Sequence, residues 1–201
     1  MAYRRTPVVA ARLSASRAAI VDAALALMAD GGYAAVSLAA VADRAKVAIG
    51  TVYRHFPSKS ALVAETFRQA SDRELAAVRR ALAAVPPERA GDAVEAAVEA
   101  FAHRALRGGR LAYALLAEPV DPAVETERLA FRRAYRDLLA GVVERGVTDG
   151  GLPPQDPPTT AAALVGAIGE ALVGPLSSED QAADRDLLVA NLVRFCVTAL
   201  G

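Results

Sequence analysis

The chain has 201 residues, of which 54% are hydrophobic and only 5% aromatic, and its formal net charge is zero. A chain of this length buries a full hydrophobic core in one or two domains, and its wealth of Ala and Leu without strand-like alternation predicts an all-α fold of about nine helices. The single Cys196 excludes an intramolecular disulfide and a cysteine-based metal site, and its apolar setting favours a buried structural thiol over a reactive one.

Residues 1–13 are basic and contain Pro7, which predicts a flexible arm. Such arms contact phosphates or the minor groove of DNA, and a tail without a partner is the alternative. The segment lacks the apolar stretch of a signal peptide, and no run approaches the roughly 18 apolar residues of a membrane-spanning helix. We therefore expect a soluble cytoplasmic protein with no membrane partner.

A first helix is predicted from about Ser16 to Asp30, where Gly31-Gly32 ends it. We expect this helix to pack across the stretch that follows it, residues 37–59, and to fix the angle of that stretch. The predicted DNA-binding domain covers residues 14–60, and residues 61–201 form the second predicted domain.

The stretch SLAAVADRAKVAIGTVYRHFPSK, residues 37–59, has apolar residues at helical spacing. Leu38, Val41 and Ala42 follow the i, i+3, i+4 pattern, and Val52 and Phe56 are four residues apart. This spacing predicts two short helices joined by a tight turn. Such a helix-turn-helix carries its second helix into the major groove of DNA.

Residues 47–62, VAIGTVYRHFPSKSAL, resemble the DNA-binding signature of the TetR family of transcriptional regulators. The residues that match the family pattern are Val47, Gly50, Val52, Tyr53, His55, Phe56, Lys59 and Leu62. The detailed resemblance covers about residues 12–65. It implies a helix-turn-helix head followed by a helical domain for effector binding and dimerisation.

Two residues depart from the family pattern. Lys46 stands in place of the usual glycine of the turn, which weakens the expectation of a positive φ there. Ala48 stands in place of the usual serine that caps the recognition helix, a loss that costs about 0.5–2 kcal/mol of helix stability.

Charge is distributed unevenly along the chain. Residues 1–60 carry eight basic and three acidic side chains, a net charge of +5, whereas the remaining 141 residues carry 15 basic and 20 acidic ones, a net charge of −5. The asymmetry predicts one domain that binds a polyanion and one that does not. Both lysines of the chain, Lys46 and Lys59, fall within the motif. The alternative explanation of their location is chance in a genome that favours arginine.

Double-stranded DNA is therefore the expected partner of residues 37–59. Tyr53, His55 and Lys59 are candidates for phosphate contacts, together with Ser37. The base-reading edge comprises Ala48, Ile49, Gly50, Thr51 and Arg54, next to Lys46 in the turn. Ile49 and the Thr51 methyl group suit a thymine methyl, while Arg54 suits guanine. His55 as a capping group is the alternative to its phosphate contact.

Six further helices are predicted after the motif. Their approximate ranges are 58–84, 88–107, 110–117, 122–145, 159–173 and 178–200, with Ser178 and Gln181 as a capping box for the last and Gly174-Pro175 as the end of its predecessor. The first of them joins both halves of the chain. Helices 159–173 and 178–200 carry more apolar surface than one partner helix covers, which predicts a homodimer through a four-helix bundle. An ordinary internal core is the alternative.

The resemblance implies that a small-molecule effector sits in the second domain. The candidates for its pocket are Phe101, Arg104, Tyr113, Glu118, Phe131, Tyr135 and Glu170, of which Glu170 interrupts an otherwise apolar helix and needs a partner or a wet pocket. Membership of the ordinary core is the alternative for the aromatic residues.

The resulting functional hypothesis is a ligand-responsive repressor that binds a palindromic operator. An effector-independent architectural DNA-binding protein is the alternative, which a filled second domain would favour. No catalytic or metal-ligand spacing is present, so no cofactor and no enzymatic activity are expected.

Overall fold

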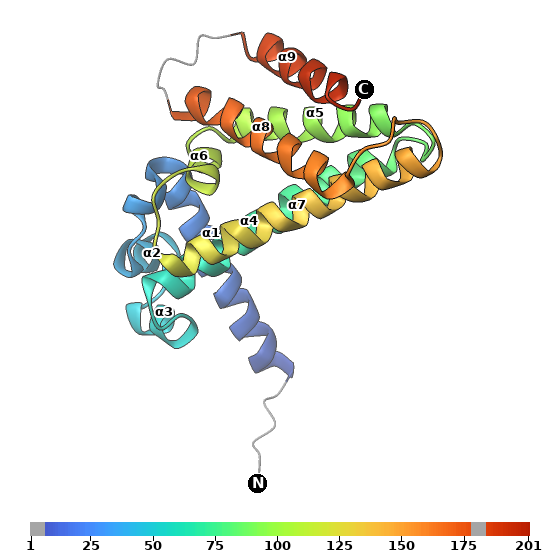
Figure 1. Cartoon of the computed structure of the whole chain (residues 1–201). Coiled ribbons are helices and arrows are strands. Elements are labelled where there is room, and N and C mark those ends of the chain that lie inside the picture. Colours follow the sequence, from blue (N-terminus) through green and yellow to red (C-terminus); the bar gives the residue numbers. More distant parts are fainter. Residues whose placement is uncertain (1–6, 178–183) are drawn as a thin grey trace.

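The structure is a computed structural model that describes residues 7–177 and 184–201. Within these residues it contains helices and no strand, which confirms the predicted all-α fold. The helices are α1 (Pro7–Ala35), α2 (Leu38–Arg44), α3 (Ile49–His55), α4 (Lys59–Ala83), α5 (Ala90–Gly108), α6 (Arg110–Leu116), α7 (Pro122–Thr148), α8 (Pro157–Ser177) and α9 (Arg185–Thr198). The long helices α4 and α7 lie side by side (Figure 1).

Two separate clusters of buried residues divide the molecule. We call residues 11–70 the head and the described part of residues 71–201 the body. The head cluster is formed by Ile20, Val21, Ala23, Ala24, Met28, Val36, Val41, Ala42, Val52, Phe56, Leu62, Val63 and Phe67, with Ala114 and Val124 from the body. The head core therefore extends past the boundary expected at residue 60, because α4 contributes its first turns to it.

An ion pair fixes α1 against α4 beside the head cluster. The guanidinium of Arg17 donates to Glu65 at 2.8 Å and lies 5.0 Å from the centre of the Phe56 ring. The hydrogen bond from Arg17 lowers the pKa of the Glu65 carboxyl to about 2 against the opposing effect of burial. This contact sets the orientation of α1 across the helix-turn-helix, as its expected role requires.

The body cluster lies between α5, α7, α8 and α9. Ala161, Leu164, Ile168 and Leu172 form the inner stripe of α8, at the spacing of a helix buried on one face. Cys196 is fully buried in this cluster, and burial raises the pKa of its thiol to about 11. The thiol is therefore structural, as its apolar neighbours in the sequence predict.

Two helix limits differ from those that the sequence indicates, and a third prediction cannot be compared. The first helix begins at Pro7, so residues 7–13 belong to it and not to an arm. Helix α8 passes through Pro175, since Pro175 falls in its last turn and Leu176 gains burial in the body core. The proposed capping box, Ser178 and Gln181, lies outside the described residues.

Two helices are long and apolar enough to cross a membrane by length and composition alone, one over Ala11–Ala35 and one over Pro157–Ser177. Helices in the core of soluble proteins share these properties. Here the first places Ile20 and Ala24 in the head core and the second places Leu164 in the body core, so their apolar residues serve packing.

Candidate functional site

The turn between α2 and α3 keeps a left-handed residue although it has no glycine. Lys46 adopts φ 54°, and in residues 7–177 and 184–201 it is the one residue other than glycine with positive φ. The amide of Val47 donates to the carbonyl of Ala42 at 3.0 Å, which closes the turn. The left-handed conformation costs a residue with a side chain roughly 1–2 kcal/mol. Lys46 therefore adopts the positive φ that glycine favours, at an energetic cost.

The ends of the short helices are capped unequally. The hydroxyl oxygen of Ser37 accepts a hydrogen bond from the amide of Ala40 at 3.1 Å, and Ser58 caps α4 in the same way through Ala61. Ala48 begins α3 with extended backbone and no side-chain cap. Helix α3 thus depends on the packing of Val52, which is fully buried, more than on its own capping.

The outward face of α3 is exposed and chemically mixed. Ile49 is 44% exposed and Tyr53 is 56% exposed, unusually high values for large apolar side chains. The exposed candidates that share this surface are Lys46, Ala48, Gly50 and Arg54, with Thr51 half-buried at its edge. The predicted base-reading residues therefore lie at the surface of the α2–α3 turn and of α3, and Ala48, Thr51 and Arg54 among them line a surface pocket against α1.

Gly50 has no packing reason inside the protein. A Cβ atom built on it meets no atom within 4 Å. Glycine within a helix costs about 0.5–1 kcal/mol relative to alanine. The site therefore has room for a side chain, and glycine leaves the α3 backbone open to the surface there.

Of the predicted phosphate contacts, Lys59 is bonded within the protein and His55 is half-buried. The ammonium of Lys59 donates to the carbonyl of Tyr33 at 2.9 Å and lies 3.9 Å from the centre of the Tyr33 ring. Burial lowers its pKa, opposed by the charges of Asp121 and Glu118. His55 is half-buried, and its Nε2 atom is buried with no hydrogen-bond partner in residues 7–177 and 184–201. Burial and the charge of Arg54 lower the pKa of His55.

A hydrogen-bonded clasp joins the head to the body around Tyr33. We use this name for Tyr33, Lys59, Ser60, Glu118 and Asp121. The hydroxyls of Tyr33 and Ser60 both donate to Asp121, each at 2.6 Å, and the amide of Tyr33 donates to Glu118 at 2.9 Å. Burial, with the bond to Asp121, raises the pKa of Tyr33 to about 12. Burial acts to raise the pKa of Asp121, but the hydrogen bonds from the hydroxyls of Ser60 and Tyr33 act to lower it, and the net shift is downward.

The break in α1 leaves space for the Glu118 carboxylate of the clasp. Gly32 adopts φ 69°, and a Cβ atom there would lie 2.6 Å from both carboxylate oxygens of Glu118. Gly31 is also non-helical, so the predicted interruption at the glycine pair is confirmed, although the helix resumes to Ala35. Glycine is required at residue 32 by both its backbone and its neighbour.

Arg128 on α7 is hydrogen-bonded to the end of α6 and to the connection that follows it. Its guanidinium donates to the carbonyls of Leu115, Ala114 and Glu118 at 3.0, 3.1 and 2.7 Å. It also pairs with Glu125 at 2.5 Å, and burial lowers its pKa. Since Glu118 bonds to Arg128 through its carbonyl and to Tyr33 through its carboxylate, this residue links α7 directly to the head.

A cavity of about 790 Å³ opens between α7 and α8. Four predicted pocket residues line it, namely Phe101, Phe131, Tyr135 and Glu170. The rings of Phe101 and Phe131 stack on Tyr135, with centres 5.0 and 6.4 Å from it. The Tyr135 side chain is 2% exposed, and its hydroxyl has no hydrogen-bond partner among the described residues.

The remaining pocket candidates lie elsewhere. Arg104 lines a smaller cavity of about 60 Å³ between α4, α5 and α6, where it forms two hydrogen bonds with Glu74 at 2.6 and 2.7 Å. Tyr113 and Glu118 line neither cavity. Tyr113 lies under the Arg110 guanidinium, 5.7 Å from its ring centre, and Glu118 belongs to the clasp.

Sequence reasoning missed the cationic lining of the larger cavity. Arg128, Arg132, Arg133 and Arg136 all line it, at spacings that place them along one side of α7. This arginine pattern, R-x-x-x-R-R-x-x-R, was the available signal. Within the described residues, no group of His, Cys, Asp and Glu side chains could hold a metal ion.

Comparison with known proteins places the head in a recognised family. The family model described as "Bacterial regulatory proteins, tetR family" matches residues 20–66. The HTH-type transcriptional repressor KstR of Rhodococcus jostii is 51% identical over 57 residues, a match that spans 28% of this chain and 27% of that repressor. This similarity therefore covers less than a third of either chain.

Similarity also extends into the body. The HTH-type transcriptional repressor KstR2 of Rhodococcus jostii is 31% identical over 141 residues, 68% of each chain. The fold is similar to that of the transcriptional regulator FadR from Bacillus subtilis in complex with stearoyl-CoA, with a TM-score of 0.79, 19% identity, and coverage of 92% of this chain and 99% of that chain. The chain belongs to the TetR family of bacterial regulatory proteins, which are DNA-binding transcriptional regulators and not enzymes.

Proposed function

We propose that the protein is a repressor that binds a palindromic DNA operator as a homodimer and leaves it when a small molecule occupies the body. The observation that carries this proposal is the outward face of α3, where exposed Ile49 and Tyr53 flank a glycine that the protein itself does not need. Residues 14–60 would supply DNA binding, and residues 61–201 effector binding and dimerisation. The proposed location is the cytoplasm, where the DNA lies.

In the proposed complex, α3 enters the major groove. Arg54 donates to guanine, while Ile49 and the Thr51 methyl group contact thymine methyls. Ala48 and Gly50 allow the backbone to approach the bases, with Lys46 at the edge of the groove. Ser37, Tyr53, His55 and Lys59 contact phosphates, for which Lys59 exchanges its bond to the Tyr33 carbonyl for one to the DNA.

The proposed dimer forms through α8 and α9. Leu187 and Phe195 are 56% and 57% exposed on α9, and such surface marks an interaction site. Two-fold symmetry sets two recognition helices about 34–36 Å apart, one turn of DNA. Gly166 and Gly169 line the α7–α8 cavity, so the close approach of helices in the bundle rests on other residues of α8.

The cavity between α7 and α8 is the proposed effector site. FadR of Bacillus subtilis, whose fold is similar, was solved in complex with stearoyl-CoA, which supports a ligand site in this architecture. Arg128 lines the cavity and bonds to the carbonyl of Glu118, whose carboxylate bonds to Tyr33 of the head. A ligand that binds along α7 beside Arg128 would therefore disturb this link and change the orientation of the head.

The architectural alternative is less well supported. It predicted a body filled by side chains, whereas a cavity of about 790 Å³ is lined by Tyr135 and Glu170. A space of this size matches that of typical small-molecule sites. Regulation by a ligand explains the cavity, and a purely structural DNA-binding role does not.

Selection of bound sequences from a random duplex library, followed by fluorescence anisotropy, tests the DNA-binding proposal. The proposal predicts a palindromic selected site and a steep decrease of affinity with salt, by roughly 0.9 in the log–log slope per phosphate contact. Arg54→Ala should reduce the difference in binding free energy between the selected and random DNA by about 1–3 kcal/mol, and so lower the ratio of the two affinities. Arg79→Ala, an exposed arginine of α4, is the control. An unchanged ratio in the Arg54 variant would contradict its role in base reading.

A further inference from the structure

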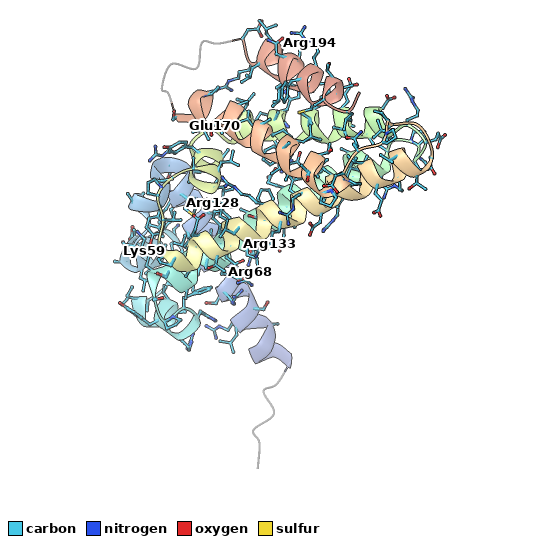
Figure 2. All side chains as sticks on the ribbon, viewed as in Figure 1. Lys59, Arg68, Arg128, Arg133, Glu170 and Arg194 are labelled. Atoms are coloured by element: carbon cyan, nitrogen blue, oxygen red, sulfur yellow. The ribbon has the colours of Figure 1, made fainter. Side chains whose placement is uncertain are left out.

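We propose that the α7–α8 cavity binds an amphipathic organic anion, with an apolar body inside and a carboxylate or phosphate head received by Arg132 and Arg133. The inference rests on the proposed function, since it names the class of effector for the same cavity. Figure 2 shows Arg133 on α7 and Glu170 on α8, the two helices between which the cavity opens.

The first observation is the charge of the cavity lining. Four arginines line it from α7, against two acids, Glu125 and Glu170. Residues 61–201 carry 15 basic and 20 acidic side chains, so this local positive excess opposes the net charge of the region. A concave surface lined by one sign of charge attracts ligands of the opposite sign.

The second observation is which arginines are free to meet a ligand. Arg128 is buried and bonded to Glu125 and to backbone carbonyls. Arg136 lies 3.7 Å from Asp137. Arg132 has one long hydrogen bond, 3.3 Å to the Leu116 carbonyl.

Arg133 makes no hydrogen bond or ion pair with any residue that the structure describes. Both Arg132 and Arg133 are exposed at the cavity, where their planar guanidinium groups can bind carboxylate or phosphate oxygens in pairs. These two side chains are therefore the receivers of the anionic head.

The third observation is the apolar interior. Leu116 and Ile168 are buried side chains of the wall, and Phe101 and Phe131 stack on Tyr135 beside them. The Tyr135 hydroxyl is the one polar group of this wall that is buried without a partner among the described residues. An apolar body with a polar atom near Tyr135 complements this lining.

Isothermal titration calorimetry with the DNA-free protein tests the inference. The probes are dodecanoate, dodecanoyl-CoA and the neutral dodecanol, which share one apolar chain and differ in the head. At least one anionic probe should bind about tenfold more tightly than dodecanol, and added NaCl should weaken it. The better of the two anionic probes distinguishes a carboxylate head from a phosphate-bearing one.

Variants of the lining sharpen the test. Arg132→Gln with Arg133→Gln should weaken the better anionic probe by about tenfold or more, because charge-assisted hydrogen bonds are lost. Arg145→Gln, an exposed arginine of α7 outside the cavity, should leave its affinity unchanged. Glu170→Gln should have the opposite effect and raise the affinity for the anionic probe by about two- to fivefold, since it removes a negative charge that repels the anionic head.

Equal binding of dodecanol and the anionic probes, or anion binding that the double arginine substitution leaves unchanged, would overturn the inference. Failure of all three probes to bind would also overturn it. If an anionic probe binds through the arginines but does not alter affinity for the selected DNA, the ligand class stands and the proposed function fails.

Discussion

The recognition surface of the head and the cavity of the body are assembled in different ways. The outward face of α3 comes from residues 46–54, one continuous stretch on a short helix. The cavity is lined by residues of α5, α6, α7 and α8, from Phe101 to Val173. Both surfaces are exposed and cationic, but only the first is contained in a local pattern.

The two regions therefore have different structural requirements. The α3 surface needs a short helix held by Val52, and it tolerates an uncapped Ala48 and a strained Lys46. The cavity needs four helices at fixed distances, and its cationic side belongs to a helix that also holds the clasp. We therefore expect substitutions in the head surface to change DNA binding with small effects on stability, and substitutions at the junction to change stability strongly.

The largest expected effect is at the junction. Arg128→Met should lower the free energy of unfolding by about 3 kcal/mol, because the carbonyls of Ala114, Leu115 and Glu118 lose their donor. Urea denaturation measures this loss. Arg136→Met, on the same helix and more exposed, is the control and should lose less than about 1 kcal/mol. Equal losses in the two variants would show that the junction is not the sensitive point.

A second expected effect concerns Gly32 at the break of α1. Gly32→Ala should destabilise the protein by about 2 kcal/mol or more, because the added Cβ meets Glu118 in a backbone conformation with φ 69°. The matched control is Gly150→Ala, which has φ 73° but no atom within 4 Å of its added Cβ. Thermal unfolding of both variants separates the backbone cost from the contact with Glu118, and an equal change in melting temperature would refute the role of that contact.

A substitution of Gly50 should have opposite effects on the stability of the protein and on its affinity for DNA. Gly50→Ala should raise the free energy of unfolding by about 0.5–1 kcal/mol, since the site is open and helical. It should at the same time weaken binding to the selected operator, measured by anisotropy. Gly91→Ala, at the second position of α5 and equally open, should give the same gain without a change in DNA affinity. Unchanged DNA affinity in both variants would remove α3 from the interface.

The smallest expected effect is relief of strain in the turn. Lys46→Gly should stabilise the protein by about 1 kcal/mol or less, because glycine adopts φ 54° without the steric cost, partly offset by its greater freedom in the unfolded chain. Lys46→Ala keeps the strain and should give no gain. Differential scanning calorimetry of the two variants measures the difference, and equal melting temperatures would show that the turn is unstrained.

The sequence was informative where interactions are local. The spacing of Val41, Val52 and Phe56 predicted the helix-turn-helix, because helical periodicity is a property of neighbouring residues. The predicted start of a helix at residue 122 agrees with α7, where Asp121 accepts hydrogen bonds from the amides of Ala123 and Val124. Pro175 was less informative, since burial of Leu176 decides whether α8 continues.

The sequence was uninformative where partners are distant. Glu118 reads as a pocket residue, but its partner Tyr33 lies 85 positions away, and this pairing depends on the packing of α6 on α1. The arginines of α7 line a cavity only because α8 lies opposite them, which their sequence pattern does not reveal. Lys59 matched the family's motif, but its bond to the Tyr33 carbonyl depends on the break at Gly31-Gly32. Tertiary contacts decide all three.

One measurement tests the central claim that the body controls the head. Fluorescence anisotropy of the selected operator should be titrated with protein in the absence and presence of the anionic probe that calorimetry shows to bind. A ligand changes DNA affinity only if it prefers one conformation. A saturating probe should weaken operator binding by about tenfold or more in the wild type, and much less in the Arg132, Arg133 double variant at the same probe concentration. Unchanged operator affinity in the wild type, with the cavity occupied, would contradict it.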